Sequence, residues 1–350
     1  MWTFPLAGSV PGNFPVTGLY LCAPREYKVN PGHREVNRKN VATELDYFIV
    51  DVFTRTALAG NPLAVVLNTA ALTTERMQAI AREVNLSETT FVERGPVDAE
   101  QTEGVRVRIF TTQEELNFAG HPTLGTASVL RLVAPEAADG DTIRLKLNVG
   151  TVPVRFEGQD PKDALNGEMT QKDPEFGAEL DLAQVARLCG LRADDLDPAL
   201  PPQVVSTGTA FAIVVLRSVE ALGRLKVNHD EATPWLRERG GRWFYVLAPV
   251  LDRNEDGTKY RSRMQFYGGE DPATGSAAGC AISYLASRGA VNSGETVRLR
   301  QGVEIGRPSD MRLSARRANP GAFAGVDAKV TDVRVGGSTV LVAKGRLFLP

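Results

Sequence analysis

Runs of hydrophobic and polar residues predict strands and helices from about residue 46 onward. Residues 46–53 are β-branched and aromatic, which predicts a strand. A turn at residues 60–62 leads into a second predicted strand at 63–67. Val105 to Phe110 alternates apolar residues with arginine and predicts another strand, and the residues after Glu88 enter a strand at Phe91.

Two helices are predicted in this first half. The first has apolar residues at helical spacing and a threonine, Thr73 or Thr74, able to cap it. Its apolar positions are Met77, Ile80, Ala81 and Val84. The second lies within residues 118–130, where small and apolar residues are typical of a buried helix.

The second half repeats this plan. A helix is predicted at 182–188 and a small-residue helix after Gly275. Strands are predicted at 204–205, 211–216, 243–247, 261–266, near 297, at 311–313 and at 340–342. Placing each residue over the one 155 positions later gives six identities in 25 positions, against about one or two expected from average composition. The identical pairs are Arg106 and Arg261, Arg108 and Arg263, Glu115 and Glu270, Gly120 and Gly275, Ser128 and Ser283, and Leu130 and Leu285. Two similar domains with a site between them are therefore expected.

Gly120-His121 and Gly275-Ser276 mark the starts of the two small-residue helices. Free N–H groups and the helix dipole at such starts bind anions. For one glycine, tight helix packing would be the simpler explanation. The paired occurrence, with a polar residue after each glycine, favours a carboxylate-binding site.

Three titratable residues are candidates for chemistry, each with a plainer alternative. His121 precedes Pro122, so we expect it outside the helix proper, with a neutral ring; the alternative is a core histidine. Asp271 is otherwise a capping or turn aspartate. Glu88 is otherwise a surface glutamate, but burial beside an apolar cleft would raise its pKa into the range useful for proton transfer.

Composition narrows the class of protein. The chain has 350 residues, enough for two domains, and a net charge of −2, which gives no reason to expect nucleic acid or an anionic membrane as partner. No apolar run is long enough to span a bilayer. Three widely separated cysteines predict neither disulfides nor a zinc site, so a cytoplasmic location is expected. Residues 1–44 lack periodicity and are expected to form a loosely ordered extension.

Motifs for several common chemistries are incomplete. A serine-nucleophile elbow would need glycine where Thr274 stands. The chain has no phosphate loop, no zinc-protease motif and no dinucleotide fingerprint after a strand, so we expect no cofactor and no metal.

Six ordered motifs resemble the PhzF-like phenazine biosynthesis family, which shares its fold with diaminopimelate epimerase. They are Asp51-Val52-Phe53-Thr54, Gly60-Asn61-Pro62-Leu63-Ala64-Val65, Leu86-Ser87-Glu88-Thr89-Thr90-Phe91-Val92, Phe118-Ala119-Gly120-His121-Pro122-Thr123-Leu124-Gly125, Glu270-Asp271-Pro272-Ala273-Thr274-Gly275-Ser276-Ala277 and Gln301-Gly302. The likeness runs from about residue 46 to the C-terminus.

The resemblance implies an α+β fold of two similar domains, each a mostly antiparallel sheet rolled around a central helix, with the active site in the cleft between them. The boundaries we expect are 45–170 with 340–350 for the first domain and 171–339 for the second, so that the last strand returns to the first. It also implies a homodimer that acts on a small carboxylate-bearing substrate.

The resemblance also implies roles for individual residues. Glu88 matches the family's catalytic acid/base, and His121, Asp271 and Ser276 match its other polar site residues. Gly120 and Gly275 match the substrate-holding helix starts, and Thr123 and Thr274 beside them are further substrate-binding candidates.

Diaminopimelate epimerase uses two cysteines as its acid/base pair. Here Ala119 precedes Gly120, the second helix start has no cysteine, and Cys280 lies about one turn further in. The proton transfer is therefore assigned to Glu88. We expect a cofactor-independent isomerase similar to dihydro-hydroxyanthranilate isomerase; the alternatives are an epimerase of an amino-acid-like substrate and a non-catalytic binding protein on the same scaffold.

Overall fold

The computed structural model describes residues 43–158, 164–251, 257–266, 269–318 and 329–349. The predicted extension, residues 1–44, lies outside the described residues except for its last two. Thr43 and Glu44 belong to the first strand, so regular structure begins slightly earlier than expected.

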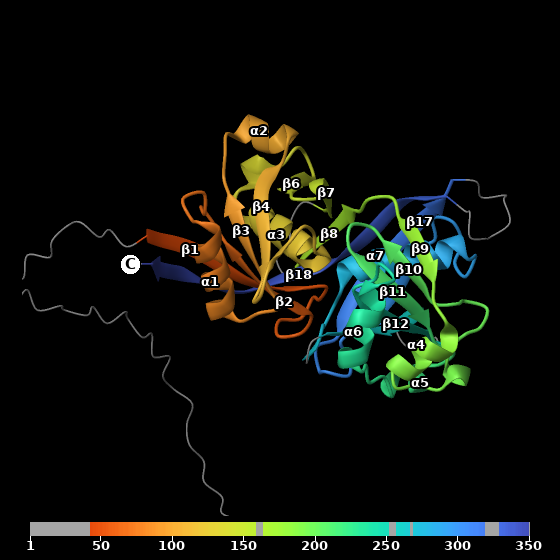
Figure 1. The fold of residues 1–350 in the computed structure, drawn as a ribbon. Coiled ribbons are helices and arrows are strands. Elements are labelled where there is room, and N and C mark those ends of the chain that lie inside the picture. Colours follow the sequence, from red (N-terminus) through yellow and green to blue (C-terminus); the bar gives the residue numbers. More distant parts are fainter. Residues whose placement is uncertain (1–42, 159–163, 252–256, 267–268, 319–328, 350) are drawn as a thin grey trace, which may run out of the picture. The chain divides into compact units, whose positions relative to one another are not determined.

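The first half of the described chain is a ring of strands around one helix (Figure 1). Its strands pair in the order β1-β2-β3-β4-β6-β7-β8-β18, and β18 pairs again with β1, which closes the ring. Helix α3 contacts β1, β2, β6 and β8 from within. The elements are β1 (Thr43–Val52), β2 (Asn61–Val66), α1 (Thr74–Val84), β3 (Glu88–Glu93), α2 (Val97–Thr102), β4 (Val105–Thr111), β5 (Glu115–Leu116), α3 (Gly120–Val133), β6 (Thr142–Leu147), β7 (Gly150–Glu157) and β8 (Leu165–Thr170).

The second half also curves its strands around one helix, α7, but among the described residues no strand pair closes them into a ring. The sheet continues in the order β18-β17-β16-β13-β12-β11-β10-β9, and α7 packs against β10, β11, β17 and β18. The elements are β9 (Glu175–Glu179), α4 (Leu182–Leu188), β10 (Gln203–Ser206), β11 (Ala210–Val215), α5 (Val219–Gly223), α6 (His229–Arg237), β12 (Trp243–Pro249), β13 (Tyr260–Arg263), β14 (Gln265–Phe266), β15 (Gly269–Glu270), α7 (Gly275–Ser287), β16 (Val297–Gln301), β17 (Ser309–Arg317) and β18 (Val330–Leu349). This is the expected α+β fold.

Strand β18 belongs to both halves. It begins against β17, then pairs with β8, and from Thr339 onward it pairs with β1. The last strand therefore returns to the first half, as expected. The division of the chain into two domains at the boundaries given above stays a prediction.

The two central helices, α3 and α7, are buried along most of their length, whereas α1 buries only one face. In α1 the apolar residues Met77, Ile80 and Ala81 lie on one buried face and Thr73 caps the N-terminus, as predicted. In α3 every residue from position 120 to 130 is buried. A methyl group on Gly125 would lie 2.6 Å from the side chain of Leu63, so the helix sits this deep only because small residues line it.

The internal repeat is visible as repeated contacts. Arg108 of β4 forms a bidentate ion pair with Glu115, with distances of 2.9 and 2.6 Å, and Arg263 of β13 forms the same pair with Glu270 at 2.9 and 2.6 Å. Inside the helices, Ser128 and Ser283 each donate a hydrogen bond to the carbonyl four residues earlier, at 2.8 and 2.7 Å. Residues that the 155-residue offset superposes thus make the same interactions in both halves.

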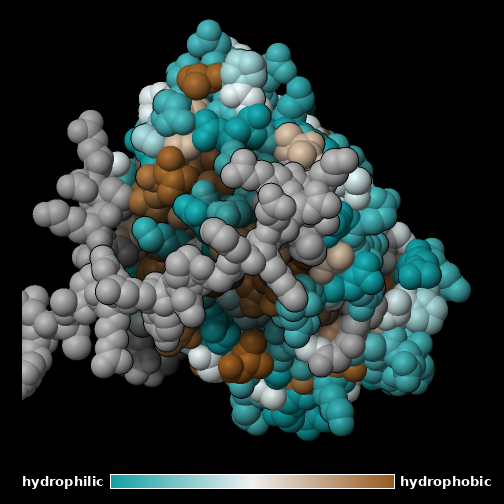
Figure 2. Space-filling model, turned by 90° about the vertical axis from the view of Figure 1, so that its left-hand side faces the viewer, coloured by the Kyte–Doolittle hydropathy of each residue, from teal (hydrophilic) through white to brown (hydrophobic). Residues whose placement is uncertain are grey.

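Among the coloured residues of the face seen in Figure 2, hydrophilic residues predominate, with groups of hydrophobic residues between them. Among the described residues, no helix combines the length and apolar character needed to cross a bilayer.

Candidate active site

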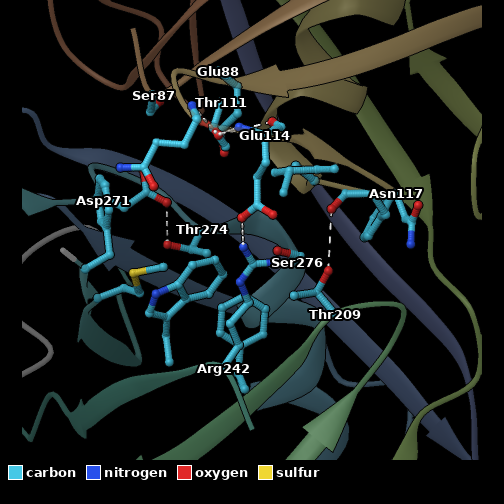
Figure 3. Close-up of a pocket in the computed structure, with 18 of the residues that line it drawn as sticks. Ser87, Glu88, Thr111, Glu114, Asn117, Thr209, Arg242, Asp271, Thr274 and Ser276 are labelled. Carbon is cyan, nitrogen blue, oxygen red and sulfur yellow. Dashed lines mark hydrogen bonds and ion pairs between the residues drawn. The ribbon is translucent and has the colours of Figure 1, made fainter. Parts of the chain in front are cut away.

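A pocket of about 890 Å³ lies beside the starts of α3 and α7. Both halves contribute to its wall. Glu88, at the first position of β3, and Glu114, in the turn between β4 and β5, come from the first half. Arg242, Asp271 and Ser276 come from the second (Figure 3).

The two helix starts touch each other at this pocket. A methyl group on Gly120 would lie only 2.5 Å from the backbone nitrogen of Ser276, so glycine is what allows this approach. Backbone N–H groups in the first turn of a helix have no carbonyl partner within that helix. The positive ends of both helix dipoles are therefore directed to one place, where an anion would be stabilised.

His121 lies within α3, and the expectation that it stands outside the helix is wrong. Helix α3 begins at Gly120, which makes His121 its second residue. Pro122 is accommodated in the first turn because its missing N–H would have had no partner there. Thr123 donates its hydroxyl to the carbonyl of Ala119 at 2.7 Å and does not line the pocket, so its contacts are those of a structural residue.

Glu88 and His121 face each other through atoms that lack hydrogen-bond partners. The Oε2 atom of Glu88 lies 3.5 Å from Nε2 of His121. Both atoms are buried and neither has another partner. The side chain of Glu88 is 15% exposed and that of His121 only 3%, so Glu88 is the member of the pair that reaches the pocket.

Asp271 is held by hydrogen bonds on both carboxylate oxygens. Asn61 donates to Oδ1 at 2.6 Å and the hydroxyl of Thr274 donates to Oδ2 at 2.6 Å. The amide of Gln301 donates to the backbone carbonyl of Asp271 at 2.7 Å and to the Thr274 hydroxyl at 3.0 Å. These contacts fix the carboxylate at the edge of the pocket.

Burial shifts the pKa of all three titratable residues away from their usual values. Burial, reinforced by the negative charge of Asp271, raises the pKa of Glu88 to about 8. Burial also raises the pKa of Asp271, to about 6, against the opposing effect of its hydrogen bonds from Thr274 and Asn61. Burial lowers the pKa of His121 to about 3, so its ring is neutral near neutral pH.

Farther from the helix starts, an ion pair joins the two halves across the pocket. Figure 3 shows the carboxylate of Glu114 meeting the guanidinium of Arg242. The guanidinium also lies over the ring of Trp243, 4.2 Å from its centre. Trp243 packs on Phe211, with ring centres 5.9 Å apart, and both line the pocket. This end of the pocket therefore has one aromatic wall and one charged contact.

The structure brings most of the predicted site residues together and adds several that were not predicted. Asn61 and Gln301 stood inside recognised motifs but carried no assigned role. Glu114 and Arg242 belong to no motif, and only their place in the fold reveals them.

The two cysteines among the described residues, Cys189 and Cys280, do not line the pocket. Cys280 is buried beside Thr207, burial raises the pKa of its thiol to about 11, and no cysteine is found among the described lining residues. Cys189 is buried in a separate apolar cluster. Within the described ranges, no group of three or more His, Cys, Asp or Glu side chains is arranged to hold a metal ion.

Comparison with known proteins places the chain in a family. The model of the PhzC-PhzF family, described as phenazine biosynthesis-like protein, matches residues 50–345. Trans-2,3-dihydro-3-hydroxyanthranilate isomerase from Pseudomonas aeruginosa is 37% identical over 309 residues, covering 87% of this chain and 99% of the relative.

Two solved structures are similar to this chain over most of its length. A predicted epimerase from Pseudomonas aeruginosa is 34% identical, with a TM-score of 0.70, and covers 87% of this chain and 99% of its own. A PhzF-family phenazine biosynthesis protein from Bacillus anthracis is 26% identical, with a TM-score of 0.72 and the same coverage. The resemblance seen in the motifs is confirmed: the chain belongs to the PhzC-PhzF family of phenazine biosynthesis-like proteins, as one of its isomerases.

Proposed function

We propose that this isomerase moves a proton between two carbon atoms of a small carboxylate-bearing substrate, with Glu88 as the only proton carrier and without a cofactor. The activity closest to this description is that named for the Pseudomonas relative, the isomerisation of trans-2,3-dihydro-3-hydroxyanthranilate. The pocket between the two halves would be the active site.

One observation carries the proposal: the largely buried side chain of Glu88, whose Oε2 atom has no hydrogen-bond partner, lines the pocket beside two helix starts. A pKa near 8 suits a group that must both take and return a proton near neutral pH. In its ionised form, Glu88 would remove a proton from an activated carbon. As the double bond shifts, the same carboxyl would deliver that proton to another carbon on the same face.

The remaining polar groups would bind the substrate. The N–H groups at the starts of α3 and α7 would hold its carboxylate, because both helix dipoles favour negative charge there. They would also stabilise negative charge that develops as the proton leaves. Asp271 and Ser276, which line the same wall, would orient an amino or hydroxyl group.

Exchange with heavy water tests this function. The full chain is incubated with trans-2,3-dihydro-3-hydroxyanthranilate in deuterium oxide, and product and recovered substrate are analysed by mass spectrometry and proton NMR. Turnover is expected for the native protein, with deuterium at the protonated carbon wherever the Glu88 carboxyl exchanges its proton with the solvent before returning it. Neither turnover nor exchange is expected for Glu88→Gln.

Glu83→Gln is the matched control, because Glu83 is an exposed glutamate outside the pocket wall. It should behave as the native chain. Turnover by Glu88→Gln would remove Glu88 from its role. Tight binding without exchange by the native chain would favour a binding protein, and inversion of a stereocentre would favour an epimerase.

A further inference from the structure

Asn61 lies at the centre of the site without reaching the pocket. It is fully buried at the start of β2, and its side-chain nitrogen lies near three acceptors. Asp271 Oδ1 is 2.6 Å away, the carbonyl oxygen of Ala273 is 2.8 Å away, and Nδ1 of His121 is 3.1 Å away. On its other side the Ser87 hydroxyl is 3.5 Å from its oxygen.

These neighbours fix which way the amide of Asn61 points. A backbone carbonyl and a carboxylate both accept hydrogen bonds, so the NH₂ group must face Ala273 and Asp271. The amide nitrogen cannot accept a hydrogen bond, and its two hydrogens are shared among three neighbours, the closest being Asp271 and Ala273. A proton on Nδ1 of His121 would point at this donor, so we take Nδ1 to be unprotonated. A neutral imidazole carries one proton, and with Nδ1 unprotonated the proton must be on Nε2.

The proton on Nε2 then faces Oε2 of Glu88, which has no other hydrogen-bond partner. Nε2 of His121 and Oε2 of Glu88 are 3.5 Å apart and otherwise unpaired. Asn61 in β2 and Glu88 in β3 thus hold opposite sides of one imidazole ring. The neutral ring follows from its burial, which lowers the pKa of His121 to about 3.

We propose that Asn61 is a positioning residue that fixes His121 in the tautomer with Nε2–H directed to Glu88. In this tautomer His121 presents a hydrogen-bond donor, Nε2–H, to Oε2 of Glu88. Resting on the proposed function, this means that the Nε2–H group of His121 donates to the proton carrier, Glu88, and favours the ionised form of its carboxyl.

The tautomer can be measured directly and without a substrate. The full chain is labelled with ¹⁵N-histidine, and long-range proton–nitrogen NMR spectra are recorded at neutral pH. Only three histidines are present, His33, His121 and His229, so a His121→Gln sample identifies the signal. We expect a neutral ring protonated on Nε2. Protonation on Nδ1, or on both nitrogens, would overturn the proposal whatever reaction the protein catalyses.

A variant tests whether Asn61 sets the tautomer. In Asn61→Asp the donor becomes an acceptor, so the proton should move to Nδ1, and kcat/KM should fall by roughly ten- to a hundredfold. Asn166→Asp is the control: Asn166 accepts a hydrogen bond from Ser338 at 2.6 Å away from the pocket, and its replacement should leave the His121 signal unchanged. An unchanged tautomer in folded Asn61→Asp would refute the role of Asn61. If that variant does not fold, the spectrum of the native chain alone decides.

Discussion

The two halves of the molecule share a scaffold but differ where chemistry is done. Both halves contain the bidentate arginine–glutamate ion pair. Both also contain the hydrogen bond from a helix serine to the carbonyl four residues earlier. At the pocket, however, the 155-residue offset places Glu88 over Trp243, each the first residue of its strand, and His121 over Ser276. At these superposed positions the first half has a carboxyl and an imidazole, whereas the second half has an indole ring and a hydroxyl.

This difference bears on the kind of reaction. An enzyme that inverts a stereocentre with two bases needs a proton carrier on each side of the substrate. The positions just before the helix glycines are Ala119 and Thr274, neither of which is an acid or base. The single carrier that we propose, Glu88, would remove and return a proton on one face, which is sufficient for the proposed shift of a double bond.

The largest effect is expected where the halves touch. In Gly120→Ala the added methyl group would lie 2.5 Å from the Ser276 nitrogen, so the helix starts must separate. We expect a loss of roughly 3 kcal/mol in the free energy of unfolding, measured by urea denaturation, together with loss of turnover. Gly95→Ala, whose methyl group would meet nothing within 4 Å, should stay close to native. Equal stability of the two variants would show that the helix starts do not pack this closely.

The repeated ion pairs should differ in their contribution to stability. In the second pair the side chains of Arg263 and Glu270 are 10% and 7% exposed, and Arg263 also donates to the carbonyls of Leu222 and Gly223. Thermal or urea unfolding should show a loss of about 3 kcal/mol for Arg263→Met. The more exposed first pair should lose only about 1 kcal/mol in Arg108→Met. A larger loss for Arg108→Met would reverse this ranking.

The pH dependence of kcat/KM should show that Asp271, in the second half, influences the ionisation of Glu88, in the first half. Activity that needs ionised Glu88 rises as pH increases through its pKa, near 8. The charge of Asp271 raises that pKa, so Asp271→Asn should move the midpoint of the rising limb of kcat/KM down by about one pH unit. Glu270 and Tyr245, the other titratable groups near Asp271, are unchanged in this variant. A midpoint that stays in place or rises would show that the charge of Asp271 does not raise the pKa of Glu88.

The smallest effect is expected at the outer end of the pocket. The side chains of Arg242 and Glu114 are 34% and 53% exposed, so their ion pair is worth about 1 kcal/mol or less. Steady-state kinetics of Arg242→Ala should therefore show KM raised by less than about fivefold with kcat nearly unchanged. A drop in kcat instead would place Arg242 in the chemical step.

Much of this scaffold could be predicted from the sequence because its elements follow simple periods. The helix at 182–188 and the strand beginning at Trp243 appear as predicted. Strands β6, β7, β8 and β9 and helices α2, α5 and α6 were not predicted. Helix α6, for example, contains Pro234, which weakens the helical pattern, yet it is held by its Asn228 cap and by burial of Leu236.

The site was predictable only as far as its motifs reached. Glu88, His121 and Asp271 were identified from the family resemblance, and the structure places them together. The role of Asn61 could not be predicted, because Gly60-Asn61-Pro62 is also a typical turn and the contact with Asp271 joins residues 210 positions apart. The pair of Glu114 and Arg242 likewise depends on how the two halves fold together.

The central claim is that Glu88, in the first half, alone transfers the proton. It is tested most directly by comparing kcat for Glu88→Gln and Ser276→Ala, with the unfolding midpoints of both variants measured in parallel. With Glu88 as sole carrier, Glu88→Gln should lower kcat by about 10²- to 10⁴-fold while folding normally. Ser276→Ala, at the superposed position of His121 in the second half, should lower kcat by less than about tenfold. A Glu88→Gln enzyme within tenfold of native kcat, or a Ser276→Ala enzyme that is equally impaired, would contradict the account.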